Sequence, residues 1–196
     1  MKHPSIRALF DYWEERRGGR MMPERAEIEP GAIRRALADT FILSFEPGMG
    51  HPFRLAGTRV CALFGREVKG EAFVHLFAHG ARRELRELLA IIAEECIGMV
   101  ASASEVGETT TSVELILLPL SHQGGNGTAR FLGALAPNGP PHWLGSRILG
   151  ALALGTYRFL GHTRAIPAMA QITAGGRGPT SWFTTVDGAE DAIRCH

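Results

Sequence analysis

Cysteine, net charge and long apolar runs are all scarce in this 196-residue sequence, and each shortage argues against a class of protein. The three cysteines are far apart and form no Cys-x-x-Cys pair, which argues against a disulfide framework or a zinc knuckle. The formal charge is +1, too small to attract nucleic acid through a general positive field. The apolar stretch between Arg147 and Arg158 is about half as long as a membrane-spanning helix. We therefore expect a cytoplasmic protein with no nucleic-acid partner and no membrane span.

The composition that is present is that of an ordinary globular domain, with 45% apolar and 21% charged residues. We expect an N-terminal helix with its connector over residues 1–30 and a main domain over residues 31–162. Residues 163–196 show little apolar periodicity, so we expect a loosely ordered C-terminal tail. Within the main domain, residues 143–160 contain several glycines and fit a helix and a strand equally well.

Apolar residues recur at helical spacing near the N-terminus. Ile6, Leu9, Phe10 and Trp13 follow the i, i+3, i+4, i+7 pattern of an amphipathic helix, whose apolar stripe must be covered. Symmetric pairing is the commonest oligomeric arrangement, and large aromatic side chains are typical of interface centres. We predict a homodimer with Leu9, Phe10 and Trp13 at its interface. In the alternative, the helix covers its own sheet.

The main domain shows two strand signals, a helical block and three further strand signals. The strands are predicted at residues 41–45, 53–60, 99–104, 110–120 and 129–135, and a long amphipathic helix is predicted at residues 82–96. Strands on either side of a helical block favour the α+β class, with a five-stranded antiparallel sheet covered by helices on one face.

A series of short motifs follows one another along the chain. They are Arg17-Gly18-Gly19-Arg20, Pro23-x-Arg25, Ile28-x-Pro30, Arg54-Leu55-Ala56-Gly57-Thr58, Phe64-Gly65-Arg66-Glu67, Gly70, Glu114 to Leu120, Gly133 to Pro137 and Trp143-Leu144-Gly145. In this order they resemble the signature of a bacterial, stand-alone PAS-domain subfamily first catalogued as a domain of unknown function. The similarity covers about residues 6–160.

The resemblance implies a PAS-like fold and a role in signal transduction. A protein of this kind is a non-catalytic sensor or regulator that binds an unidentified small ligand, a protein partner or both. The alternative is a pure interaction module whose cavity is filled by its own side chains. No nucleophile elbow, Ser/His/Asp arrangement or paired-carboxylate motif argues for an enzyme. The sequence identifies no cofactor, ligand or partner.

Candidate residues for lining a ligand cavity come from the predicted strands and the helical block. They are Phe53, Leu55, Phe64, Phe73, His75, Phe77, Glu114 and Leu115. Glu114 interrupts an otherwise apolar strand, and two interpretations of it stay open. It is either a polar anchor inside the cavity or one partner of a cross-sheet ion pair with Arg54 or Arg130.

Glu71, His75 and His79 are each four residues apart. On one regular helix they would share a face and could bind iron or zinc, and His75 or His79 alone could ligate a haem. The sequence has no H-E-x-x-H motif, and Gly80 would weaken the end of such a helix. We therefore expect a structural role for these residues and assign no metal site.

Overall fold

An antiparallel sheet is the centre of the structure. The computed structural model describes residues 1–107, 111–122, 127–139 and 147–160. In these residues the strands are β1 (Thr40–Ser44), β2 (Phe53–Ala56), β3 (Gly98–Glu105), β4 (Ser112–Leu120), β5 (Arg130–Pro137) and β6 (Leu152–Leu160). Their order across the sheet is β2-β1-β5-β4-β3-β6, and all neighbours are antiparallel. With the helices described below, this confirms the α+β class.

The sheet has six strands in the described residues, one more than predicted. The additional strand, β6, lies in the stretch 143–160, where the sequence fitted a helix and a strand equally well. It pairs with β3 at the edge of the sheet, and its Tyr157 and Phe159 pack against the core. Pairing with a strand 47 to 62 residues away therefore decided its conformation. Residues 140–146, which include the Trp143-Leu144-Gly145 motif, lie outside the described residues.

The predicted long helix corresponds to α3 (Arg82–Glu95). The predicted strand 53–60 ends earlier, at Ala56, and α2 (Thr58–Phe64) follows it. Gly57 lies between β2 and α2, where the chain passes too close to the Ala38 carbonyl oxygen for a side chain. A Cβ atom at this position would lie 2.3 Å from that oxygen. Short 3₁₀ helices complete the described structure: Arg25–Glu27, Leu37–Asp39, Pro47–Met49, Phe73–Leu76 and His79–Ala81.

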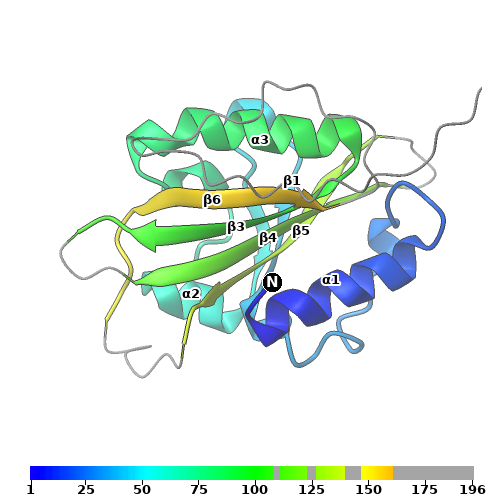
Figure 1. Ribbon diagram of the computed structural model, residues 1–196, viewed down its shortest axis with the longest axis horizontal. Helices are drawn as coiled ribbons and strands as arrows, with labels where there is room; N and C mark the ends of the chain where they lie inside the picture. The colour runs from blue at the N-terminus through cyan, green and yellow to red at the C-terminus, as the bar shows by residue number, and fades with distance from the viewer. Residues whose placement is uncertain (108–110, 123–126, 140–146, 161–196) are drawn as a thin grey trace, which may run out of the picture. The chain divides into compact units, whose positions relative to one another are not determined.

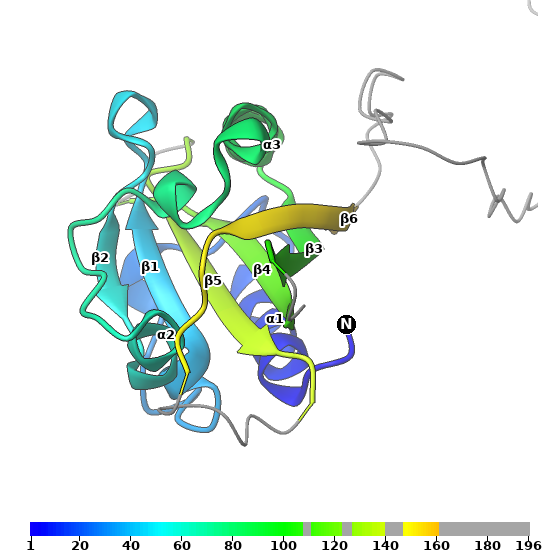
Figure 2. The same cartoon turned by 90° about the vertical axis from the view of Figure 1, so that its left-hand side faces the viewer.

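Helices cover both faces of the sheet. α2 and α3 pack on one face, called here the inner face, together with Phe41 and Leu115 from the strands. α1 (Pro4–Arg17) packs on the opposite, outer face against Ile42 and Ile116. Figures 1 and 2 show α1 and α3 on opposite sides of the strands. No helix of the described residues is long and apolar enough to cross a membrane.

The apolar stripe of the N-terminal helix packs on the sheet of the same chain. Ile6, Leu9 and Trp13 are completely buried against the outer face. The Trp13 indole Nε1–H donates a hydrogen bond to the Pro119 carbonyl oxygen at 2.9 Å. Phe10 is only partly buried and stacks on Trp13, with 6.5 Å between ring centroids. Leu9 and Trp13 therefore do not lie at an exposed surface, which corrects the predicted dimer contact. The homodimer itself stays a prediction.

α1 and the whole sheet belong to one compact unit, which spans Met1–Arg164. The predicted tail, residues 163–196, lies outside the described residues, so its loose order stays a prediction.

We expect Trp13→Ala to lower the free energy of unfolding by about 3–5 kcal/mol, because it removes a fully buried indole and leaves a cavity. Urea unfolding at equilibrium measures this loss. Phe10→Ala is the matched control on the same helix, and its cost should be clearly smaller because Phe10 is only partly buried. Equal costs for the two variants would contradict this position of α1.

Candidate functional site

Most of the predicted cavity residues lie together on the inner face. Phe53, Phe64, Phe73, Phe77 and Leu115 are all buried in the inner core. The ring of Phe73 contacts those of Phe53 and Phe77 edge-on, with centroid distances of 5.7 Å and 5.6 Å. These edge-to-face contacts are a favourable geometry for aromatic pairs. These residues thus share one core cluster between the sheet and the helices, and their contact with a ligand stays a prediction.

Phe41 joins this cluster from β1. Its ring lies 5.4 Å from Phe53 and 5.5 Å from Phe73, measured between centroids. We call Phe41, Phe53, Phe73 and Phe77 the aromatic cluster. From the sequence, Phe41 was expected only in a strand, because strand periodicity does not tell which of two apolar faces receives a given ring.

Two of the predicted cavity residues do not line the interior. Leu55 is 44% exposed, because it pairs with Ile42 and so faces outward on the edge strand β2. His75 is exposed on the 3₁₀ helix Phe73–Leu76, whose Phe73 and Leu76 turn inward instead. A 3₁₀ helix has three residues per turn, so His75 falls on the solvent side.

The three residues of the suggested metal site are not on one helix. Glu71 precedes the 3₁₀ helix that contains His75, and His79 begins a separate one. Glu71 instead forms an ion pair with Arg66, with 3.0 Å between Arg66 Nε and Glu71 Oε1. The four-residue spacing therefore does not produce a shared face. In the described part of the chain, no group of three or more His, Cys, Asp or Glu could hold a metal ion.

A buried histidine in the interior was missed by the sequence analysis. His51 is 1% exposed and contacts the rings of Phe45 and Phe131, with centroid distances of 5.5 and 5.4 Å. Its Nδ1 lies 3.3 Å from the Ser44 carbonyl oxygen, which can only accept, so Nδ1 is the protonated nitrogen. His51 sits in a turn-rich segment with a positive φ of 58°, and that segment predicted only a loop.

Burial lowers the pKa of His51 below its ordinary value of about 6.5, because the apolar surroundings disfavour the charged imidazole. The Ser44 carbonyl opposes this shift, and the nearby charge of Arg86 adds to it, while Glu46 acts in the opposite direction. His51 is therefore neutral in the folded protein near pH 7.

Glu114 lies on the outer face, away from the aromatic cluster. Its side chain is held by the start of the chain: the Lys2 amide lies 2.9 Å from Oε1 and the His3 amide 2.7 Å from Oε2. The α-ammonium group of Met1 lies 3.7 Å from Oε1. Neither of the two sequence interpretations is therefore correct. Arg54 pairs with Glu46 instead, and Glu114 anchors the segment that leads into α1.

A second buried carboxylate holds the same end of α1. Asp39 is 1% exposed and accepts a hydrogen bond from the Ser5 hydroxyl at 2.6 Å. Arg59 on α2 donates to both Asp39 oxygens, at 2.6 and 2.7 Å. This bidentate pair raises the pKa of the Arg59 guanidinium. Nothing in the local sequence around Asp39 signalled these partners, which lie 34 and 20 residues away.

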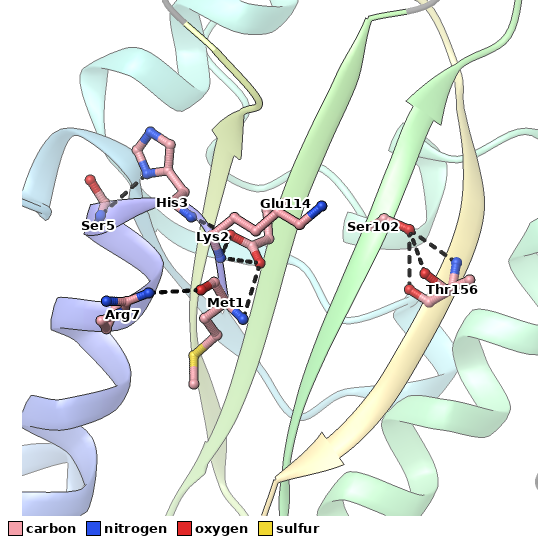
Figure 3. Close-up of polar contacts among 8 residues, drawn as sticks. All are labelled: Met1, Lys2, His3, Ser5, Arg7, Ser102, Glu114 and Thr156. Carbon is pink, nitrogen blue, oxygen red and sulfur yellow. Dashed lines mark hydrogen bonds and ion pairs between the residues drawn. The ribbon is translucent and has the colours of Figure 1, made fainter. Parts of the chain in front are cut away.

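A groove lies on the outer face beside this anchor. Its volume is about 300 Å³, and its polar lining consists of Lys2, Ser102, Glu114, Asn138, Thr156 and Arg158. Figure 3 shows the Lys2 side chain extending from the start of α1 toward the side of the groove where Ser102 and Thr156 lie. Of these residues, only Glu114 was expected from the sequence, because the others are brought together from β3, β6, the end of β5 and the N-terminal segment.

Comparisons with known proteins give one result. A family model described as PAS domain matches residues 1–136, a range that begins before α1 and reaches into β5. No curated protein and no solved structure shows a significant match.

We expect the free energy of unfolding to fall as the pH decreases from about 6.5 toward the lowered pKa of His51. The unfolded histidine binds a proton at the higher pH, so the stabilisation is fully present above 6.5 and is lost below it. Urea unfolding between pH 5 and pH 8 measures this slope. His51→Asn, which tolerates a positive φ, should reduce the slope, whereas His75→Asn should retain it. A wild-type slope unchanged by His51→Asn would contradict the assignment.

We expect Glu114→Ala to lower the free energy of unfolding by about 1–3 kcal/mol, because the Lys2 and His3 amides lose their acceptor. Glu114→Gln should cost less, since its carboxamide oxygen still accepts one bond. Glu94→Ala, at an exposed position of α3, is the control and should be nearly neutral. If Glu114→Ala were as neutral as Glu94→Ala, the carboxylate would not anchor the chain.

Proposed function

Because the chain belongs to the PAS-domain family, we propose that it is a non-catalytic regulatory module that acts through contact with a protein partner, with its interior filled by its own side chains. PAS domains are sensory and regulatory modules, which supports a role in signalling. They are generally non-catalytic and often mediate dimerisation or ligand binding. The partner is either a second copy of the chain or another protein.

The aromatic cluster is the observation that carries this proposal. It occupies the space between the sheet and α2, α3 and the 3₁₀ helix Phe73–Leu76, where a PAS ligand would be held. Phe41, Phe53, Phe73 and Phe77 are each at most 1% exposed, and their rings are in direct contact. A ligand of ordinary size could enter only by displacing several of these rings. Close packing of this kind favours a module that signals by surface contacts.

A ligand-binding sensor is the second candidate function. His51 favours it, because a single placed polar group among aromatic side chains is typical of ligand sites. The imidazole already has a partner in the Ser44 carbonyl, which supports a structural role for it. The two functions differ in whether a small molecule occupies the interior.

We expect the native mass of the protein purified from cells to be a whole multiple of its denatured mass, without the additional mass of a ligand. Mass spectrometry under both conditions measures this, and an absorption spectrum checks for a flavin or haem band. A stoichiometric additional mass in the native spectrum would favour the ligand-binding sensor instead.

Phe73→Ala provides a matched test of the filled interior. Removing a ring from the centre of the aromatic cluster leaves an apolar cavity, which can bind a small apolar molecule such as benzene. We expect benzene to raise the melting temperature of this variant and to leave that of the wild type unchanged. An equal rise in both proteins would show that the wild-type interior already has room.

A further inference from the structure

We propose that the outer-face groove is a binding site for a small anionic molecule, whose carboxylate or phosphate group is held by Lys2 and Arg158. This site is independent of the proposed function, because it lies on the opposite face of the sheet from the aromatic cluster. Its evidence is the convergence of charged and polar side chains from α1's leading segment, β3, β4 and β6 on one concavity.

The charges of the groove are not balanced. Lys2, Arg158 and the α-ammonium group of Met1 are the cations of its lining. Met1 pairs with Glu114, whereas neither Lys2 nor Arg158 forms an ion pair within the described residues. Glu114 is the acidic residue of the lining, and the Lys2 and His3 amides already occupy its oxygens. An anion in the groove would therefore meet two cations without an ion pair and a carboxylate whose oxygens are already bound by the Met1 ammonium and the two amides.

Neutral hydrogen-bonding groups lie beside the two cations. Ser102 Oγ lies 3.1 Å from Thr156 Oγ1 and accepts the Thr156 amide at 3.0 Å (Figure 3). The Ser102 hydroxyl donates to the Thr156 carbonyl oxygen at 3.2 Å, so the Thr156 hydroxyl is the one that can turn its hydrogen toward a bound oxygen atom. A guanidinium and an ammonium flanked by hydroxyls match the oxygens of a carboxylate or a phosphate.

An irregularity in the sheet places these hydroxyls. The β3–β6 register shifts between Ala101 and Ala103, so Ser102 faces an extra residue on β6. Gly155 makes this close approach possible, because a Cβ atom there would lie 2.6 Å from Ser102 Oγ. Such bulges often occur beside binding sites, where they redirect a side chain. Here the bulge turns Ser102 and Thr156 toward each other at the groove.

The size and position of the groove indicate the ligand. A volume of about 300 Å³ is at the lower end of the range for small-molecule sites, so a metabolite-sized anion fits better than a polymer. α1 packs over β4 and β5 and leaves this part of the outer face uncovered. Lys2 takes part both in the anchor of α1 and in the groove, because its backbone amide binds Glu114 and its side chain lines the groove. Occupancy of the groove would therefore also stabilise the docked start of α1.

The test uses pyrophosphate and citrate as separate probes at constant ionic strength, followed by two-dimensional NMR of the full chain. We expect at least one probe to give saturable shifts at the amides of Lys2, Ser102, Thr156 and Arg158. Lys2→Gln and Arg158→Gln should each lower the affinity for that probe by about tenfold or more, because each removes a charge-assisted hydrogen bond. Arg34→Gln, at an exposed position away from the groove, is the control and should bind like the wild type.

The outcomes separate the two anion classes. Saturation by pyrophosphate alone would identify a phosphate site, and saturation by citrate alone a carboxylate site. Shifts that never saturate, or an Arg34→Gln variant that loses as much affinity as Arg158→Gln, would overturn the proposal. A ligand that native mass spectrometry finds on the wild type, Lys2→Gln and Arg158→Gln alike would contradict the proposed function without affecting this site, because it does not depend on the groove.

Discussion

The arrangement of the protein depends on β4, which carries apolar side chains on both of its faces. Leu115 and Leu117 point into the inner core, while Ile116 and Leu118 point to the outer face, and all four are completely buried. A strand of this kind is stable in water only when both sides are covered, because each exposed apolar side chain costs free energy. α1 supplies the second cover and is therefore part of the fold.

Two buried carboxylates direct where α1 lies. A buried charge is tolerated only when it is paired and hydrogen-bonded, so Glu114 and Asp39 each require partners. Glu114 receives the amides of Lys2 and His3, and Asp39 receives the Ser5 hydroxyl together with Arg59. Apolar packing alone would allow α1 to slide along the sheet. These directional bonds hold its first turn at one position.

The two faces of the sheet have different properties, and this division underlies both proposals. The inner face is closed by aromatic side chains that pack on one another, which favours stability and a surface-mediated function. The outer face is apolar where α1 packs and at Val100 and Leu160, and it becomes polar where Ser102, Thr156 and Arg158 line the groove. Its groove lies at that boundary, next to the anchored start of α1. A molecule bound there would contact the segment that leads into the helix without disturbing the inner core.

The sequence by itself determined the α+β class, α1, α3 and the presence of five strands, although β2 ends earlier than predicted, because these depend on the spacing of apolar residues along a short stretch. It also identified most of the inner-face cluster, whose members are simply the large apolar residues of those elements. Only the tertiary structure decided that β6 is a strand, that His51 is buried and that Glu114 faces the N-terminal segment. The physical reason is distance along the chain: His3 and Glu114 are 111 residues apart, and local periodicity contains no information about which strand face a distant segment will cover.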